Sequence, residues 1–286
     1  MEKLPKYYLS LLLLATLFIS CGNDISKMTA EERKQQSLAL YQEAESLHIG
    51  QGSPAIMTKL QEAAAMDPTN CDAVRELSVA YLKRGMIDEW KPKFDKAVAC
   101  NPKIWVPWRG YLYLQFYRDY EKAIADFNAS DTLTLNFKDA PQGQSVDYWR
   151  GIAYLGLIDY ETSVAYFDEY IETITAETGE DWAEPTAFLY KGIALFKDNQ
   201  LTESEKAIDT YLKYTRGVTA DGHYYKAALL LKNGYCEAAR KSILLATSNF
   251  EAENFYKHDY TEVLHQLYAE DIQSLSIQID NCLTIK

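Results

Sequence analysis

Histidine and cysteine are the side chains best able to bind a metal or attack a substrate, and this chain contains few of either. No two histidines have the four-residue spacing of a helical metal site, and no cysteine lies within four residues of a histidine. The sequence also lacks a glycine-rich phosphate loop and a nucleophile elbow. We therefore expect no metal, no cofactor and no enzyme activity. The histidines are His48, His223, His258 and His265.

One cysteine near the start of the chain has a neighbourhood that suggests covalent modification. Two lysines precede an apolar run from Tyr7 to Ile19, and Ser20 stands immediately before Cys21. The run is short for a membrane-spanning helix and fits the apolar core of a secretory signal. The four residues ending at Cys21 resemble the lipobox of bacterial lipoproteins, with Phe18 where leucine is usual. The alternative is an ordinary secretory signal with a chance cysteine.

The lipoprotein resemblance implies an address in the bacterial envelope. Residues 1–20 would be the signal peptide, and Cys21 would carry acyl chains such as palmitate at the head of a polar tether, 21–29. Two or more acyl chains give stable anchoring where a single chain would be marginal. In some known lipoproteins, aspartate after the cysteine retains the protein in the inner membrane. Gly22 stands there in this chain, which favours the outer membrane and leaves the leaflet open.

The charge balance argues against nucleic acid as a partner. The chain has 41 acidic and 29 basic residues, a net charge of −12, and such a chain repels phosphate backbones. The stretch 168–184 holds seven acids and no base. It is either a solvated helix end or a docking patch for a basic partner. Thirteen glycines and eight prolines are few for this length, which favours long helices over a turn-rich β fold.

The body of the chain contains an internal repeat. Pro68 and Pro102 lie 34 residues apart, and three later glycines recur at intervals of 41 residues. Each of these glycines is followed by a large apolar residue at a comparable distance. Two antiparallel helices pack closely only if small residues lie where they cross, and large residues then fill the space beside the crossing. The glycines are Gly110, Gly151 and Gly192, and the large residues are Phe127, Phe167 and Ile208.

This pattern resembles the tetratricopeptide repeat (TPR). The resemblance implies an all-α, right-handed TPR-type solenoid of about six helical hairpins over residues 30–250. Extra residues in the middle repeats fall in two connections, 131–144 and 177–184. A helical pattern continues over 252–275, so residues 251–286 are expected to form a capping helix and a tail.

Four cysteines remain after Cys21. Within the expected hairpins, Cys71 begins a first helix and Cys100 ends its partner, so their ends would be adjacent. A disulfide between these two is allowed, and two buried thiols are the commoner outcome. Cys236 and Cys282 are too far apart in sequence to judge.

The TPR resemblance also implies a function. The first helix of each TPR hairpin lines a concave groove, so we expect a lipid-anchored adaptor that binds other proteins, with the membrane touched only through the anchor. Such an adaptor would suit a scaffold for outer-membrane or cell-wall assembly. The alternative is a glycan-binding lipoprotein that uses groove aromatics, suggested by 22 tyrosines and five tryptophans. The candidate groove residues are Tyr111, Tyr148, Ile152, Phe196 and Tyr224.

The anchor is open to a direct test. We expect Cys21→Ser to release the protein from the membrane fraction or to stall its processing, because the modified sulfur is lost. Fractionation and the mass of the processed chain measure both effects. Cys71→Ser is the matched control and should stay in the membrane. Unchanged membrane retention and cleavage of Cys21→Ser would rule out lipidation.

Overall fold

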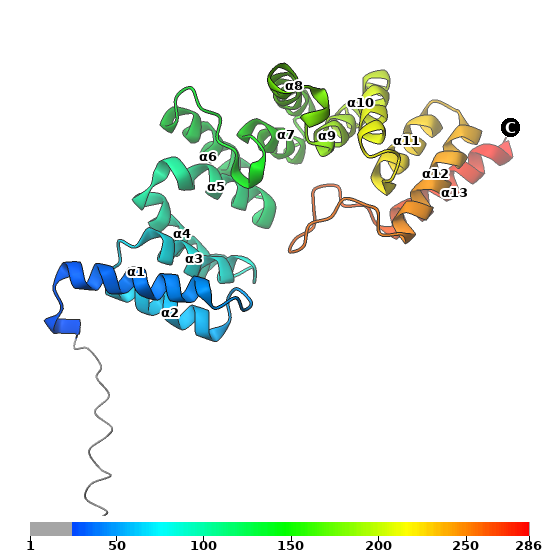
Figure 1. The fold of residues 1–286 in the computed structure, drawn as a ribbon. Helices are drawn as coiled ribbons and strands as arrows, with labels where there is room; N and C mark the ends of the chain where they lie inside the picture. Colours follow the sequence, from blue (N-terminus) through cyan, green and yellow to red (C-terminus); the bar gives the residue numbers. More distant parts are fainter. Residues whose placement is uncertain (1–24, 286) are drawn as a thin grey trace, which may run out of the picture. The chain divides into compact units, whose positions relative to one another are not determined.

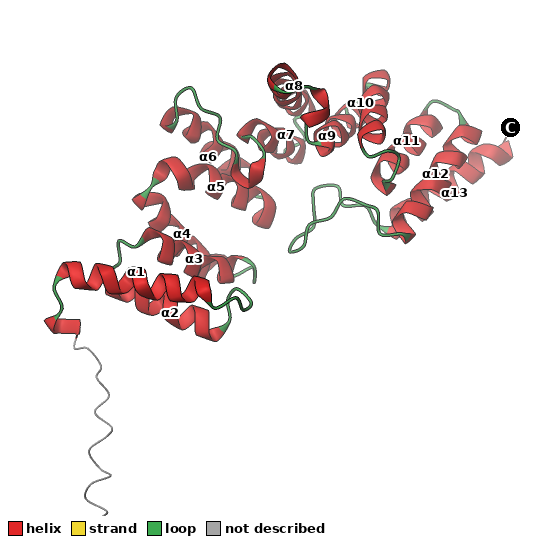
Figure 2. Ribbon diagram, viewed as in Figure 1, coloured by secondary structure: helices red, strands yellow, loops and turns green. Residues whose placement is uncertain are grey.

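A computed structural model describes residues 25–285, whose regular secondary structure is all helical, with no β-strand among them (Figure 2). The predicted signal peptide and Cys21 lie outside the described residues. The α-helices are α1 (Ala30–Ser46), α2 (Pro54–Met66), α3 (Cys71–Leu82), α4 (Ile87–Cys100), α5 (Pro102–Leu112), α6 (Tyr120–Leu133), α7 (Val146–Gly156), α8 (Tyr160–Glu177), α9 (Pro185–Lys197), α10 (Leu201–Tyr214), α11 (Ala220–Lys232), α12 (Cys236–Glu251) and α13 (Ala269–Ile285). Short helical turns are η1 (Ile25–Lys27), η2 (Tyr113–Tyr117), η3 (Pro141–Gly143) and η4 (Glu180–Trp182).

The chain divides into two compact units, with the division between Val79 and Ala80. In the first unit, α1 begins at a capping box, since Thr29 and Glu32 exchange side-chain to backbone hydrogen bonds. The Ser37 hydroxyl on α1 donates to the carbonyl of Ala63 on α2 at 2.7 Å, so a buried polar contact fixes how the two helices pack.

The second unit is built from helices that pack as consecutive antiparallel pairs (Figure 1). At each crossing the predicted glycine faces the predicted large side chain. A Cβ atom added to Gly151 would lie 2.8 Å from the ring of Phe167, and one on Gly192 would lie 2.6 Å from Ile208. The hydroxyl of Ser163 also donates to the carbonyl of Gly151 at 2.8 Å. The repeat register predicted from the glycine spacing is therefore confirmed.

The core of the second unit is rich in aromatic residues and falls into two clusters. The larger runs from the end of α3 to α11 and includes Trp90, Phe127, Tyr148 and Phe167. The smaller joins α11, α12 and α13. The inserted connections fall where the sequence predicts them, after α6 and after α8.

The prediction of a helix over 252–275 is wrong for most of its length. Residues 252–268 form a loop. Helix α13 then begins at Ala269 and continues beyond residue 275, where the tail was predicted to begin. Glu253 and His265 have positive φ angles of 58° and 56°, which a helix does not allow. The apolar residues of the pattern also serve two different clusters, because Leu264 packs on the larger one and Leu267 on the smaller.

A disulfide joins Cys236 at the start of α12 to Cys282 near the end of α13, with Cα atoms 5.9 Å apart. The loop 252–268 lies inside the ring of chain that this bond closes. Cys71 and Cys100 belong to different units, and their pairing stays a prediction. Over residues 25–285, no helix is both long enough and apolar enough to cross a membrane.

The crossing of α7 and α8 should be intolerant of a larger side chain. We expect Gly151→Val to lower the free energy of unfolding by about 1–3 kcal/mol, because its side chain overlaps the buried ring of Phe167. Urea denaturation followed by circular dichroism measures the change. Ala125→Val, on the exposed side of α6, is the control and should change stability by only a few tenths of a kcal/mol. Equal effects would mean that the crossing is not tightly packed.

Candidate functional site

Residues 252–268 connect α12 to α13 and fold back over helices that come much earlier in the chain. We call them the return segment. Figure 1 shows it in orange, extending from the end of the unit past α11 and α9 toward α7. Its partners come from α11, α9, α7 and η2, and from Lys83 just after α3. We call the surface that α11, α9, α7 and η2 present to the segment the inner face.

The beginning of the return segment is held through its backbone. The amide of Ala220 donates to the carbonyl oxygen of Asn254 at 2.7 Å, and the amide of Tyr256 donates to Oδ2 of Asp221 at 2.8 Å. Asp221 is only 3% exposed. Burial raises the pKa of its carboxyl group to about 6, although the hydrogen bond from Tyr256 favours the charged form. Both contacts are made to the backbone of the segment, so they do not depend on its side chains.

The middle of the return segment packs on the aromatic core. The rings of Tyr190 and Tyr256 have centroids 6.1 Å apart and are nearly perpendicular, a favourable edge-to-face arrangement. Burial, and then the neighbouring phenol of Tyr256, raise the pKa of Tyr148. Leu264 and Ile152 line a remaining cavity of about 20 Å³, which has room for about one water molecule. The segment therefore fills this part of the inner face almost completely.

The tip of the return segment makes polar contacts near the surface. Nζ of Lys83 donates to the hydroxyl of Tyr260 at 3.0 Å and lies 4.2 Å from the centre of its ring. Nε2 of Gln115 donates to Oγ1 of Thr261 at 2.8 Å. Tyr260 is nevertheless 54% exposed. The tip is thus placed by specific contacts without being buried.

A local irregularity of the backbone contributes to these contacts. The turn η2, Tyr113–Tyr117, is a π-helix that continues α5, and such turns occur often at functional sites. It supplies Phe116, whose ring meets that of His258 edge to face at 5.9 Å. The turn ends at Arg118, which has a φ of 51° and whose guanidinium lies 3.4 Å from the carboxylate of Glu262.

The five predicted groove residues do not share one environment. Tyr111 and Tyr148 belong to the core, and Tyr148 is 1% exposed with its hydroxyl 2.7 Å from Oγ1 of Thr186. Ile152 is buried beneath the return segment, while Phe196 and Tyr224 are half-buried. Neither Tyr111 nor Tyr148 offers a free surface, and a binding role for the five residues stays a prediction.

Sequence reasoning missed the residues that contact the segment most specifically. Asp221, Lys83 and Arg118 have ordinary spacing within the repeats, and nothing in the pattern distinguishes them from solvated charges. The signal that could have identified the segment lies in residues 254–268 themselves. Four tyrosine or phenylalanine residues are interspersed there with many polar ones, which is more aromatic residues than a solvent-exposed capping helix requires.

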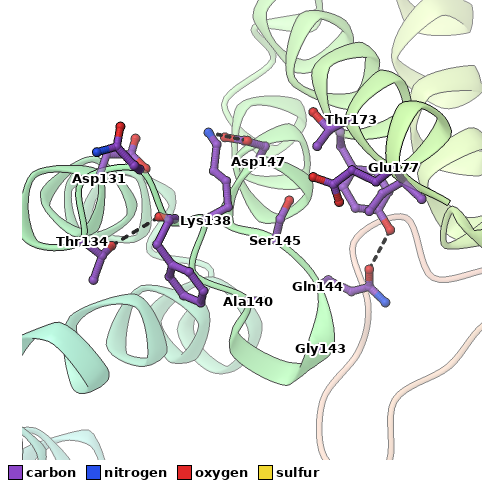
Figure 3. Close-up of a pocket in the computed structure, with 14 residues that line it drawn as sticks. Asp131, Thr134, Lys138, Ala140, Gly143, Gln144, Ser145, Asp147, Thr173 and Glu177 are labelled. Atoms are coloured by element: carbon purple, nitrogen blue, oxygen red, sulfur yellow. Dashed lines mark hydrogen bonds and ion pairs between the residues drawn. The ribbon is translucent and has the colours of Figure 1, made fainter.

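A second concavity lies between the α6–α7 connection and α8 (Figure 3). Its volume is about 700 Å³, and Phe137 forms part of its wall. Lys138 is paired with Asp147 at 2.6 Å, and the hydroxyl of Tyr170 donates to Gln144 at 2.7 Å. The cation of this cleft is thus already neutralised. The acidic stretch 168–184 borders it, and a docking role for that stretch stays a prediction.

Metal binding finds no support in residues 25–285, where no group of three or more histidines, cysteines, aspartates or glutamates is arranged to hold an ion.

Comparison with known proteins supports the fold. No model of a protein family matches the chain, and no curated protein matches its sequence. The crystal structure of PilW, a type IV pilus biogenesis factor, is similar with a TM-score of 0.62 and 17% identity, covering 84% of this chain and 98% of PilW. PilF of Pseudomonas aeruginosa has a TM-score of 0.57 and 17% identity, covering 77% and 99%. BtubC from P. vanneervenii has a TM-score of 0.58 and 12% identity, covering 82% and 98%.

These similarities and the paired helices define an all-α, TPR-type solenoid. At these levels of identity the likeness shows the fold alone. Folds of this type generally present surfaces for other proteins.

The buried carboxyl group of Asp221 gives a testable pH dependence. With a pKa of about 6 instead of its usual 3.8, the native state binds a proton more tightly than the unfolded state. The contribution of Asp221 to the free energy of unfolding therefore falls as the pH rises from about 4 to about 6. We expect Asp221→Asn to match the wild type near pH 4 and to be more stable at pH 7 by up to about 3 kcal/mol.

Urea denaturation at a series of pH values between 4 and 7 measures this difference. The control is Asp259→Asn, which alters an exposed carboxylate at the tip of the return segment and should leave the pH profile nearly unchanged. A profile for Asp221→Asn that runs parallel to that of the wild type over this range would show that Asp221 titrates normally.

Proposed function

We propose that the protein is a lipid-anchored, non-catalytic adaptor of the bacterial envelope that binds other proteins through its TPR-type solenoid. One observation carries this proposal: the inner face holds an irregular, non-helical stretch of polypeptide through backbone hydrogen bonds and aromatic contacts. A surface with this chemistry suits an extended segment of another protein. A buried carboxylate that accepts a backbone amide hydrogen and adjacent aromatic rings are the features that such recognition needs.

The proposed anchor would keep the adaptor close to the membrane. The first long helix begins at Ala30, nine residues after Cys21. Nine residues span at most about 32 Å when fully extended. The solenoid would therefore meet partners at the membrane surface, which suits a scaffold for outer-membrane or cell-wall assembly.

The similar structures are compatible with such a role. One of them, PilW, is described as a type IV pilus biogenesis factor, and biogenesis is a task of assembly. We take from them the suggestion of an assembly factor and leave the assembled structure open.

The glycan-binding alternative receives no specific support. It requires aromatic rings that are free to stack on sugars, and Tyr111 and Tyr148 are both buried.

Site-specific photo-crosslinking in the intact envelope tests the adaptor function. A photoreactive amino acid replaces Gln115 on the inner face in one variant and Glu121, exposed on α6, in the other. We expect the first to form a discrete adduct with another envelope protein and the second to form none, because binding would use the inner face. Adducts that are absent from both variants, or the same in both, would contradict an adaptor that works through this face.

A further inference from the structure

The return segment behaves as a ligand that belongs to the same chain. We propose that the inner face binds an extended segment of a partner protein, and that the return segment occupies this site in the free protein and is displaced by the partner. The proposal rests on the adaptor function and specifies the kind of segment that would bind. Its evidence is the set of contacts that the return segment makes.

The first recognition element is a backbone clamp followed by an aromatic site. Asp221 accepts the amide hydrogen of Tyr256, and the ring of that residue then lies against Tyr190. A carboxylate that accepts a backbone amide hydrogen and an aromatic wall together select a non-helical chain with an aromatic side chain at this position.

The second recognition element lies four residues further along. Lys83 contacts both the hydroxyl and the ring of Tyr260, and Arg118 faces the carboxylate of Glu262. The order of contacts describes a segment with two aromatic residues four positions apart and an acid two positions after the second. A partner with these groups would make the same contacts.

Two cations lie near this part of the return segment, although the whole chain is acidic. Burial, and then the positive charges of Lys197 and Arg118, lower the pKa of the His265 imidazole to about 4. Burial disfavours any charged group, whereas the two positive charges favour a carboxylate. The charge of the site thus agrees with the acidic residue of the deduced ligand.

The tip of the return segment is held loosely enough to be displaced. The Arg118–Glu262 pair is separated by 3.4 Å, and its side chains are 48% and 64% exposed. Exposed pairs of this kind contribute little to stability. Tyr260 and Asp259 are also exposed, so leaving the inner face removes few buried contacts at the tip.

Both ends of the segment are fixed independently of the tip. Leu267 is buried in the cluster formed with α12 and α13, and the disulfide between Cys236 and Cys282 ties those two helices together. The segment can therefore leave the inner face without separating α12 from α13, and a partner must then replace the core contacts of Tyr256 and Leu264. A tethered occupant competes at an effective concentration on the order of millimolar, which weakens the apparent affinity of a partner.

A peptide copied from the segment provides the test. In one variant of the full chain, purified in detergent, a Gly/Ser segment of equal length replaces residues 255–266. A fluorescent peptide with the sequence of residues 254–266 is then titrated with this variant and, separately, with the intact protein. We expect fluorescence anisotropy to show saturable binding to the variant that is at least about tenfold tighter than to the intact protein, because the tethered competitor is gone.

The matched control is the same peptide with Ser in place of Tyr256 and Tyr260, which should bind at least about tenfold more weakly because both aromatic contacts are lost. Equal affinity for the variant and the intact protein would overturn the proposal. So would an absence of binding to a variant that keeps its helical circular dichroism and its disulfide.

A second variant covers the case in which the Gly/Ser chain does not fold. A protease site inserted after Asp259 is cleaved in the folded protein, and the disulfide keeps α13 attached. The cleaved protein should bind the peptide more tightly than the uncleaved protein, and equal binding would overturn the proposal.

The two proposals fail in different ways. If the peptide does not bind but Gln115 still crosslinks to an envelope protein, the displacement mechanism fails and the adaptor stands. If the peptide binds as expected but no envelope protein crosslinks, the adaptor function fails and the intramolecular ligand stands.

Discussion

The close crossing of two helices within each hairpin is the constraint on which the rest of the second unit depends. Where Gly110, Gly151 and Gly192 face large apolar side chains, the backbones approach within a distance that no Cβ atom would allow. This approach turns the remaining aromatic residues of the first helices toward their neighbours along the unit. The aromatic core and the inner face follow from the same packing, because the residues that are not used at the crossing line the surface between hairpins.

The return segment completes a surface that would otherwise expose part of this core. Tyr256 and Leu264 pack on the larger cluster, and little space remains beneath them. Covering an apolar surface with a segment of the same chain keeps a solenoid soluble, as terminal caps do in repeat proteins. Here α13 caps the end of the unit and the return segment covers its inner face.

The sequence was sufficient to predict the hairpins because their determinants are local and repeated. The spacing of Gly151 and Gly192, and the large residue after each, report a contact between neighbouring helices. The return segment depends on contacts between residues more than one hundred positions apart, such as Gln115 with Thr261, and no periodicity records these. Tyr148 illustrates a second limit. Its place in the repeat suggested a groove position, whereas the side chain is buried in the core with its hydroxyl against Thr186 of the next hairpin.

The placement of Asp221 connects the stability of the fold with its use. A buried carboxylate is unfavourable unless hydrogen-bond donors surround it, and the amide of Tyr256 supplies one of these donors. If the return segment leaves, this donor leaves with it, and water or another backbone amide must take its place. An extended segment of a partner presents such an amide wherever its chain lies in register. Because Asp221 requires a hydrogen-bond donor, replacement of the return segment by a partner's backbone is more favourable than an empty inner face.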